Sequence, residues 1–437
     1  MSIGPNLRAA GRAAPGWASV RDVKQTNWAG NHTYRAAVVH RPASLDQLRE
    51  LVAGAGRLRA LGSRHSFSEI ADSDELVSLD GLPAEVAVDH GAGTVSVGAG
   101  LRYGELAEAL KAEGVALANL ASLPHISVAG AVATATHGSG DANGNLATAV
   151  AGLELVTATG DLLTASRGDP DFDGLVVGLG ALGVVPRLTL DVEPAYQVRQ
   201  RTFQDLPWAT LFEHFDEVTG AGYSVSLFTR WGPAVEQVWV KSQVTAEPER
   251  ALADLFGAVP ATVDRHPILG IDPVNCTPQL GVAGPWSDRL PHFRMGFTPS
   301  SGEELQSEYH LPRGQAAAAL EALRGIGDRL RPVLQVSELR TVAADRLWMS
   351  PQYGQDTLAV HFTWGPDWAA VRPVLAELEA ALAGFGARPH WGKLFLAGAD
   401  TIAGLYPRHG DFARLAGRLD PGGVFTNAWL RERVLGG

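Results

Sequence analysis

The hydrophobic positions in the first part of the chain predict short helices and strands. In 44–56, SLDQLRELVAGAG, leucines at positions 45, 48 and 51 form one stripe of a helix. Ser44 and Gln47 have the spacing of a capping box, and glycines follow the last leucine. The run RLRALG, 57–62, then predicts a strand that leads into the turn GSRHSF.

Short β-rich runs follow this turn. LVSL, EVAVD and TVSVGAG are separated by glycine and aspartate and predict strands, and a helix is predicted near Tyr103–Ala112. After 192–196, VEPAY, helix-like stretches such as 314–330 alternate with strands such as 357–364, TLAVHFTW. The pattern predicts an α+β fold in which strands dominate, with a domain boundary near residue 195.

Two strands of the second region carry polar side chains on one face. In VSELRT, Glu338 and Arg340 are two residues apart, which places them on the same face of a strand. In 357–364, His361 and Thr363 lie on the face opposite the apolar residues. Two interpretations stay open at this point. Either pair can simply face water, or both pairs can line a site.

Small residues dominate 120–140, LASLPHISVAGAVATATHGSG. They would let a ligand approach the backbone, and a helix starting near Val128 would direct free N–H groups at an anion such as a pyrophosphate. A buried helix that packs closely through small residues is the alternative. The run 178–183, GLGALG, also matches G-x-G-x-x-G, but a β-rich stretch with Pro186 follows where a dinucleotide site needs a helix. We interpret that run as a glycine-rich turn between two strands.

Composition narrows the class of protein. A chain of 437 residues, 46% of them hydrophobic, exceeds what one core usually holds and predicts two or more domains. A formal net charge of -11 without a basic block argues against nucleic acid or an anionic membrane as partner. The longest apolar run, 174–185, is well short of the roughly 18 residues of a membrane span. Cys276 is the only cysteine, which excludes an internal disulfide and a cysteine-built metal site and favours the cytoplasm.

Six separated motifs carry a resemblance to a known family. They are LGSRHSFSEIADSDELVSLDGLP, ASLPHISVAGAVATATHGSG, VSELRTVAAD, LAVHFTW, RPHWGK and FTNA. In this order they resemble the alditol oxidases (xylitol oxidases), flavoproteins of the vanillyl-alcohol-oxidase type, over nearly the whole chain from TNWAGN at 26–31. We therefore expect an α+β fold of two domains: a flexible tail (1–20), an FAD-binding domain (21–195), an inserted α+β substrate or cap domain (196–394) and a C-terminal segment that rejoins the FAD-binding domain (395–437).

The resemblance also implies how the cofactor is held. In this family the histidine of the G-S-x-H-S turn is joined covalently to the 8α-methyl of FAD, which implies His65 here, and a neutral imidazole supplies the nucleophilic nitrogen. Arg64 occupies a position where some relatives have glycine. The segment 120–140 holds no cysteine, so a single tether is implied. The residues implied to contact FAD are Ser63, Arg64, His65, Ser66, Ser122, Ser127, Gly130, Thr134, His137, Gly138, Ser139 and Asn427.

A substrate site and a reaction follow from the same resemblance. The implied catalytic residues are Glu338, Arg340, His361 and Lys393, and the implied polyol-binding residues are these four with Ser122 and Thr363. A hydride would pass from the terminal CH₂OH carbon to flavin N5, giving an aldose, and O₂ would be reduced to hydrogen peroxide. His361 could hold Glu338 in place or accept the hydroxyl proton, and this choice stays open.

Other functions compete with this reading of the sequence. An aldonolactone oxidase or dehydrogenase would have a similar polar site, whereas a flavin-binding module without turnover is disfavoured by the paired polar strands. Ala121, beside Ser122, is small and would leave room for O₂ if it lies over the flavin. We expect a monomer that binds a small polyol and O₂, with no metal, nucleic acid or membrane partner.

Overall fold

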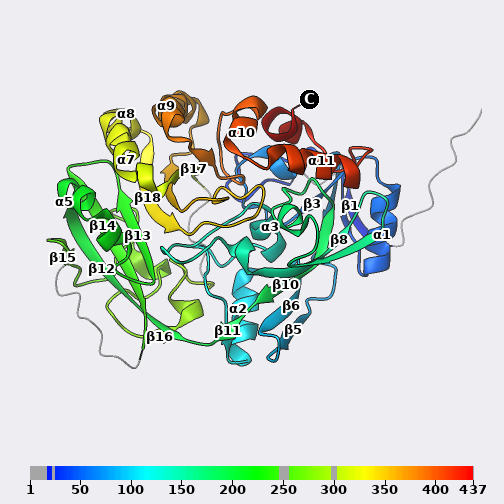
Figure 1. The fold of residues 1–437 in the computed structure, drawn as a ribbon, viewed down its shortest axis with the longest axis horizontal. Coiled ribbons are helices and arrows are strands. Elements are labelled where there is room, and N and C mark those ends of the chain that lie inside the picture. Colours follow the sequence, from blue (N-terminus) through cyan, green and yellow to red (C-terminus); the bar gives the residue numbers. More distant parts are fainter. Residues whose placement is uncertain (1–16, 22–24, 246–254, 297–302, 437) are drawn as a thin grey trace, which may run out of the picture.

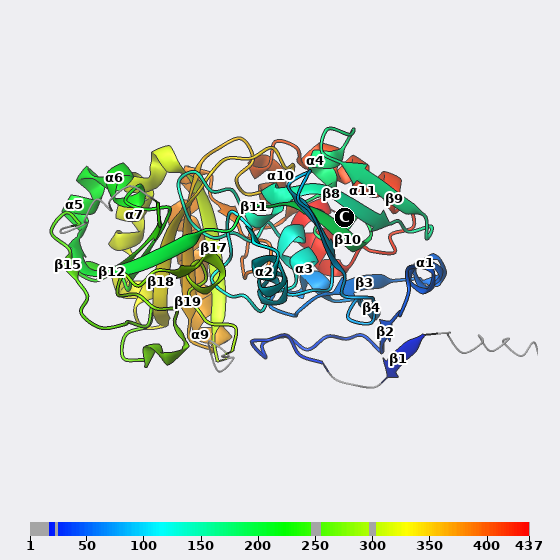
Figure 2. The same cartoon turned by 90° about the horizontal axis from the view of Figure 1, so that it is seen from below.

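The computed structural model describes residues 17–21, 25–245, 255–296 and 303–436. Two parts lie side by side: the strands before residue 195 form one part, and a large antiparallel sheet forms the other (Figures 1 and 2). None of the helices within the described ranges has the length and apolarity that crossing a lipid bilayer requires.

The first sheet carries the predicted GSRHSF turn at the end of one strand. β2 (Val38–Arg41) and β3 (Leu58–Leu61) both pair in parallel with β4 (Glu75–Ser78), and helix α1 (Leu45–Gly54) connects β2 to β3. Ser44 Oγ accepts a hydrogen bond from Gln47 N at 3.3 Å, and Gln47 Oε1 accepts one from Ala43 N at 2.8 Å, so the predicted helix start is confirmed. The described strands of this sheet, in spatial order, are β1 (Ala18–Arg21), β2 (Val38–Arg41), β4 (Glu75–Ser78) and β3 (Leu58–Leu61).

Strand β1 corrects the predicted N-terminal tail. We expected residues 1–20 to be a tail, but Ala18–Arg21 pairs antiparallel with β2. The indole Nε1 of Trp17 donates to His40 Nδ1 at 3.1 Å, which anchors the start of the strand. Residues 1–16 of the predicted tail lie outside the described residues.

A second, antiparallel sheet forms the rest of the first part. Its order is β5 (Val86–Asp89), β6 (Thr94–Gly98), β10 (Val184–Asp191), β8 (Val150–Val156) and β9 (Leu162–Ser166). Leu106 of α2 (Tyr103–Ala112) and Val132 of α3 (Val128–Ala133) share one core with Leu188 of β10. The predicted helices at 103–112 and from Val128 are confirmed. Shorter elements are β7 (Val115–Ala116), which pairs with β11 (Glu193–Pro194), and η1 (Glu69–Ala71), η2 (Leu146–Ala149) and α4 (Phe172–Leu175).

The GLGALG run joins α4 to strand β10. A strand follows it, so the rejection of a Rossmann helix is confirmed. The element before the run is the short helix α4, however, and not a strand. The prediction of a turn between two strands is therefore wrong for the element that precedes the run.

The large sheet is built from strands between Gln197 and Pro389. In spatial order its described strands are β15 (Val259–Pro260), β12 (Gln197–Pro207), β14 (Ala234–Gln243), β13 (Ser224–Thr229), β18 (Leu334–Val342), β19 (Thr357–Trp364), β17 (Leu305–Pro312) and β20 (Arg388–Pro389), and β16 (Gly284–Pro285) pairs with β12. The division of the chain into domains at residues 195 and 394 stays a prediction.

The two faces of this sheet have different neighbours. On one face Phe362 is fully buried in the core with the helices, and the Tyr309 hydroxyl donates to Glu379 of α9 (Trp368–Leu382) at 2.6 Å. On the other face His361 and Thr363 are only 8% and 6% exposed, so the interpretation that they face water is wrong. The helices and helical turns of this part are α5 (Trp208–Glu213), α6 (Phe215–Thr219), α7 (Ala316–Gly325), α8 (Gly327–Leu330), α9 (Trp368–Leu382), η3 (Pro273–Asn275), η4 (Trp286–Asp288), η5 (Arg313–Gln315) and η6 (Ala383–Phe385).

The C-terminal segment returns to the first part of the chain. Figure 1 shows its helices in orange and red beside the first sheets. Leu58 N of β3 donates to Val424 O at 2.9 Å, which extends the backbone pairing of that strand. Asn427 lies at the start of α12 and holds the backbone of 69–72. The elements of this segment are α10 (Ala399–Leu405), α11 (His409–Leu419), α12 (Ala428–Leu430) and the π-helical turn η7 (Arg431–Leu435).

Asn427→Ala tests this anchor. The Asn427 Nδ2 donates to the carbonyls of Glu69 at 3.0 Å, Ile70 at 3.3 Å and Asp72 at 2.9 Å, and Oδ1 accepts from Leu430 N at 2.8 Å. Because buried carbonyls lose their donor, we expect the substitution to lower the free energy of unfolding by about 3 kcal/mol, measured by urea denaturation.

Asp367→Ala is the matched control. Asp367 also caps a helix, α9, but it is exposed to water. Loss of an exposed cap costs about 1 kcal/mol. Equal destabilisation by the two substitutions would show that Asn427 acts only as a cap.

Candidate active site

A cavity of about 610 Å³ lies between the two parts of the chain. One wall consists of β3 with the turn after it, the segment 121–137 and the loop before β10, and the other is the polar face of the large sheet. The predicted site residues that line it are Ser63, Arg64, His65, Ser66, Ser122, Ser127, Gly130, Thr134, His137, Glu338, Arg340, His361, Thr363 and Lys393. The two halves of the predicted site, which are up to 330 positions apart in the sequence, therefore share one cavity.

Three predicted cofactor residues do not line the cavity. Gly138 packs so closely on Asn119 that an added Cβ would lie 2.2 Å from its Oδ1. Ser139 is buried and donates to the carbonyl of Val225. Asn427 holds the backbone of 69–72. Ser139 and Asn427 therefore bind backbone carbonyls, Gly138 permits close packing, and none of the three lines the cavity.

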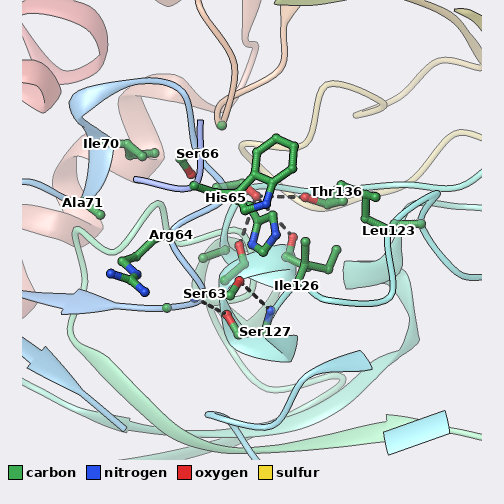
Figure 3. A pocket seen from close by; sticks show the side chains of 18 of the residues that line it. Ser63, Arg64, His65, Ser66, Ile70, Ala71, Leu123, Ile126, Ser127 and Thr136 are labelled. Atoms are coloured by element: carbon green, nitrogen blue, oxygen red, sulfur yellow. Dashed lines mark hydrogen bonds between the residues drawn. The ribbon is translucent and has the colours of Figure 1, made fainter. Parts of the chain in front are cut away.

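The GSRHSF turn and the start of α3 are in close contact. Ser127 N donates to Ser63 Oγ at 2.9 Å, and Ser63 N donates to Ser127 Oγ at 3.4 Å. A Cβ added at Gly62 would lie 2.6 Å from Ser127 Oγ, and one at Gly130 would lie 2.7 Å from the same atom. Glycine at 62 therefore permits the approach of the turn to α3, and glycine at 130 leaves room for the Ser127 side chain within α3. Ser63 and Ser127 face each other where the two segments meet (Figure 3).

Arg64 has a left-handed backbone conformation, with φ of 63°. This conformation costs a non-glycine residue about 1 kcal/mol, which explains physically why a glycine suits this position. Its side chain is exposed and points away from His65 (Figure 3). The turn thus keeps its shape despite the arginine.

His65 is a neutral imidazole against an aromatic wall. Its ring stacks on Trp28 at 5.5 Å between centroids. Burial lowers the pKa of His65 to about 4, and the neighbouring charges of His125, Arg102 and Lys393 act in the same direction. Its Nδ1 is buried and has no hydrogen-bond partner among the described residues. A neutral ring with an unused nitrogen fits a bond to a cofactor carbon, and the glycine-lined loops fit a ligand that approaches the backbone.

The start of α3 differs from the expectation for an anion site. We predicted that its first N–H groups would be free for a phosphate. Val128 N instead donates to Leu101 O at 2.8 Å, and Ala129 N donates to Ala99 O at 3.2 Å. These two donors hold the 99–101 loop against the helix, so that part of the prediction is wrong.

The loop 178–183, which the sequence analysis interprets as a turn and not as a nucleotide site, lines the same cavity. Buried Arg59 holds it in place by donating to Leu179 O at 2.7 Å and Gly180 O at 3.2 Å. The same guanidinium donates to Phe425 O at 2.6 Å and so joins the C-terminal segment to the cavity wall. Burial lowers the pKa of Arg59 to about 10, so it remains a cation at neutral pH. The glycines of GLGALG are the sequence feature that could have indicated this loop as part of the cavity wall.

A buried ion network occupies the polar face of the large sheet. The register places Glu308, His361 and Glu338 side by side on β17, β19 and β18. Arg340 Nη2 donates to Glu308 Oε1 at 2.7 Å, and its Nε lies 3.5 Å from Glu338 Oε1. Arg340 Nη1 also donates to Ser122 Oγ at 3.4 Å. The predicted residues Ser122, Glu338 and Arg340 therefore converge.

This network fixes the charges of its members. Burial alone would raise the pKa of Glu308, but Arg340 and His137 outweigh it and hold that pKa well below the usual range. In the same way, Arg340 and His292 outweigh the effect of burial on the pKa of Glu338 and hold it well below its usual value. Burial lowers the pKa of Arg340, but the two carboxylates outweigh this effect and raise it. All three groups are therefore ionised at neutral pH.

Lys393 and His361 meet at Gln306 on β17. Lys393 Nζ donates to Gln306 Oε1, His361 Nε2 lies 3.1 Å from the same oxygen, and Lys393 Nζ lies 3.5 Å from His361 Nε2. Burial and the Lys393 charge lower the pKa of His361 to about 3, so its ring is neutral. Burial also lowers the pKa of Lys393.

Gln306 and Glu308 are functional candidates that the sequence analysis missed. Both line the cavity. They alternate with Leu305, Ser307 and Tyr309, so LQSEYHLP has the same period-two pattern of polar positions as the strands 334–342 and 357–364.

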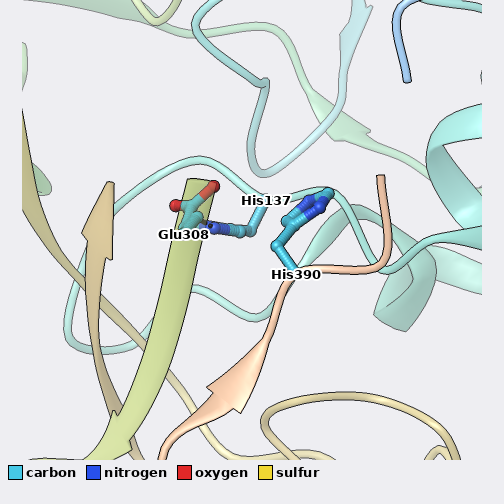
Figure 4. A group of neighbouring side chains, drawn as sticks. All are labelled: His137, Glu308 and His390. Atoms are coloured by element: carbon cyan, nitrogen blue, oxygen red, sulfur yellow. Dashed lines mark hydrogen bonds and ion pairs between the residues drawn. The ribbon is translucent and has the colours of Figure 1, made fainter. Parts of the chain in front are cut away.

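His137, Glu308 and His390 form a further buried cluster (Figure 4). One donor atom from each lies within 4.8 Å of the others, a spacing that could hold a metal ion. However, Glu308 Oε1 is shared by Arg340 and by His137 Nε2 at 3.0 Å. A metal cation there would lie against the guanidinium, so we interpret His137 and Glu308 as part of the hydrogen-bonded network of Arg340, with the His390 ring packed beside His137.

Comparisons with known proteins agree with this geometry. Residues 36–166 match the family described as FAD binding domain, and residues 301–433 match the family described as D-arabinono-1,4-lactone oxidase. The crystal structure of cholesterol oxidase from Brevibacterium sterolicum superimposes with a TM-score of 0.78 at 16% identity, covering 98% of this chain and 99% of that one. The predicted two-domain α+β fold of an FAD oxidase is thereby confirmed. The fold and site define an FAD-dependent oxidoreductase.

Sequence relatives make the assignment narrower. Alditol oxidase of a Streptomyces species is 53% identical over 416 residues, which cover 94% of this chain and 99% of that protein. L-gulono-1,4-lactone dehydrogenase of Mycobacterium tuberculosis is 30% identical over 94% of this chain and 99% of that protein. The chain belongs to the alditol oxidase family of vanillyl-alcohol-oxidase-type flavoproteins.

Glu308→Gln tests the ion network. The amide keeps the shape but leaves Arg340 without its closest carboxylate, so we expect a loss of about 3 kcal/mol in the free energy of unfolding at neutral pH. Because the folded-state pKa of Glu308 is depressed, its contribution is present above the unfolded-state pKa and is lost as the pH falls. The difference from the parent protein should therefore narrow below about pH 4. Urea denaturation at several pH values measures it.

Glu377→Gln provides the control, because Glu377 pairs with Arg329 at 2.7 Å on the exposed surface. We expect no change in the denaturation midpoint. If Glu308→Gln, like Glu377→Gln, had the urea denaturation midpoint of the parent protein, the buried network would add no stability.

Proposed function

We propose that this protein oxidises the terminal primary hydroxyl group of an alditol to the aldose, with covalently held FAD and with O₂ reduced to hydrogen peroxide. One observation carries the proposal: six polar side chains from separate strands and loops converge on the cavity that His65 also lines. They are Ser122, Glu338, Arg340, His361, Thr363 and Lys393. The relationship to an alditol oxidase at 53% identity supports the choice of substrate.

His65 would carry the cofactor, and the loops around it would hold the rest. The buried Nδ1, which has no hydrogen-bond partner in the part of the chain that the structure describes, and the depressed pKa of the ring support this assignment. The turn at 62–67, the start of α3 and the loop 178–183 supply backbone at the same cavity. When bound, FAD would accept the hydride and pass two electrons to O₂.

The chain's own residues would bind and polarise the polyol. A polyol needs several donors and acceptors, and Arg340 and Lys393 donate while Glu338 accepts. The two cations would also stabilise negative charge that develops on the reacting oxygen. Both side chains line the same cavity, so the reacting hydroxyl would be held between them.

Of the two roles considered for His361, its contacts favour proton acceptor. The ring contacts Gln306 and Lys393, and its neutral state leaves a nitrogen lone pair. The position of Glu338 is instead held by His292, whose Nε2 lies 2.7 Å from Glu338 Oε1. Because Gln306 Oε1 can only accept, His361 Nε2 donates to it and keeps the ring in place, and Nδ1 retains the lone pair that would take the hydroxyl proton.

Oxidation of an aldonolactone is the second candidate. The match of residues 301–433 to the D-arabinono-1,4-lactone oxidase family covers β17, β18 and β19, which carry most of the polar site. A lactone also presents several hydroxyl groups without net charge, so the same side chains would suit it. The two candidates differ in the substrate that reduces the flavin.

We infer three further properties from the sequence. These are a cytoplasmic location, favoured by the single cysteine, a monomeric state, and domains at 21–195 and 196–394 with 395–437 completing the first. The return of the C-terminal segment to β3 supports the last of them.

Anaerobic mixing with xylitol tests the proposed function. We expect the long-wavelength flavin absorbance to bleach, and to recover with formation of hydrogen peroxide when air is admitted. A flavin that stays oxidised with xylitol but bleaches with L-gulono-1,4-lactone would transfer the assignment to the second candidate. Lys393→Met serves as the control, because loss of the cation should slow reduction at least about 100-fold while flavin stays bound.

His65→Ala tests the tether. The parent protein should keep its yellow colour in an acid-precipitated pellet, whereas the variant should release flavin into the supernatant because no covalent bond holds it. His125→Ala is a matched control, since His125 is a neighbouring imidazole whose Nδ1 is also buried without a partner among the described residues. Release from this variant but not from His65→Ala would move the tether to His125.

A further inference from the structure

A buried chain of polar groups leads from Glu338 to a lysine outside the cavity. His292 Nε2 lies 2.7 Å from Glu338 Oε1, and Lys241 Nζ lies 3.0 Å from His292 Nδ1. Lys241 Nζ also donates to the carbonyl of Leu290. Lys241 is 1% exposed and does not line the cavity, so it cannot touch a ligand there.

The chemistry of the two ends fixes the state of the imidazole between them. An ammonium group only donates hydrogen bonds, so His292 Nδ1 accepts from Lys241. An ionised carboxylate only accepts, so His292 Nε2 carries the proton and donates to Glu338. Burial, the Lys241 charge and Arg340 lower the pKa of His292 to about 4 despite Glu338, which agrees with a neutral ring.

The contacts of Glu338 leave one of its oxygens available. Within the described residues, its contacts with His292 and with Arg340 Nε both use Oε1. Glu338 lines the cavity and no bond from a described residue to its Oε2 is found, so this oxygen can accept a hydrogen bond from a ligand hydroxyl. His292 also holds the opposite wall, because its backbone N donates to Ser122 O at 3.1 Å.

We propose that His292 and Lys241 are positioning residues of the substrate site: Lys241 orients His292, and His292 holds Glu338 so that Oε2 binds a substrate hydroxyl. This inference rests on the proposed function only for the identity of the substrate. Neither residue follows from a sequence motif, since Lys241 and His292 lie on separate segments 51 positions apart.

The proposal includes a dependence on pH. Burial, with Arg340 adding to it, lowers the pKa of Lys241 to about 7, while the carboxylate of Glu338 opposes this shift. Two further titratable groups face this chain: His361 faces Glu338, and Cys276 faces Lys241. Burial keeps the His361 imidazole and the Cys276 thiol uncharged near neutrality. As the pH rises through about 7, Lys241 loses its charge, and the His292 bond to Glu338 loses the cation that polarises it.

The first test compares His292→Phe with His292→Gln in the holoenzyme. Phenylalanine keeps the ring shape but has no donor, whereas glutamine supplies an amide donor in place of Nε2–H. We expect the dissociation constant of the reducing substrate, taken from anaerobic flavin reduction, to rise about 10- to 100-fold for His292→Phe. For His292→Gln we expect a rise of less than about threefold. Equal impairment of both, or none in His292→Phe, would overturn the proposal.

Lys241→Met tests the outer end of the chain. Substrate affinity of the parent enzyme should fall as the pH rises from about 6 to about 8, and the variant should show no such change. An unchanged inflection in the variant would contradict the role of Lys241. Gln200→Met is the matched control, because Gln200 is fully buried and lies opposite Lys241 in the sheet register, but bonds to the carbonyls of Thr277 and Pro278 and not to His292.

A measurement without substrate separates this proposal from the proposed function. Long-range proton–nitrogen NMR of histidine-labelled holoenzyme at about pH 6 should show His292 protonated at Nε2 and bare at Nδ1. A ring protonated at Nδ1, or at both nitrogens, would overturn the proposal. Affinities are to be measured with whichever of xylitol and L-gulono-1,4-lactone reduces the flavin. If neither does, the proposed function fails, and the NMR result alone decides the role of His292.

Discussion

The buried guanidinium of Arg340 is the charge on which the candidate site depends. It is 6% exposed and lies against carboxylates from two strands, Glu308 on β17 and Glu338 on β18. Removing such a cation from water costs several kcal/mol unless carboxylates and hydrogen bonds compensate for the lost hydration. The two acids supply that compensation, and the guanidinium in turn keeps both of them ionised. Each of the three charges is therefore stable at this depth only because the sheet register brings the other two to it.

The histidines around this network let it remain buried without excess charge. Burial lowers the pKa of His361 and of His390 to about 3, so both rings are neutral. Neutral rings can still donate and accept hydrogen bonds, but they add no further cation beside Arg340 and Lys393. A site of this kind can bind a neutral ligand that carries many hydroxyl groups, because directional hydrogen bonds are available while the charges are already balanced. The electrostatics of the sheet thus agree with the substrate class proposed from the lining residues.

Much of the fold and part of the site followed from local patterns. Helix α1 could be predicted because its capping residues and its leucine stripe lie within one short segment, and the shared face of His361 and Thr363 followed from the period of a strand. The environment of that face could not be predicted in this way. A polar strand face looks the same in sequence whether water or another part of the chain covers it. Here the covering part is the turn at 62–67 and the segment 121–137, which are distant in the sequence and meet the strand only in the folded chain. For the same reason Glu308 was overlooked, although its strand has the same alternation.

The cofactor side shows the opposite relation between sequence and structure. The motif around His65 was recognisable, yet the residues that hold the cavity wall in shape are scattered: Arg59 joins the loop 178–183 to the C-terminal segment through backbone carbonyls alone. Every residue type has a backbone carbonyl, so the residues that accept these hydrogen bonds show no pattern in the sequence. Asn427 likewise binds the backbone carbonyls of 69–72. Its motif was therefore recognisable, but the sequence indicated a contact with the cofactor where the structure has a contact with backbone. Side chains that bind backbone fix the shape of this cavity, whereas side chains that bind one another fix its charge, and only tertiary structure brings either set together.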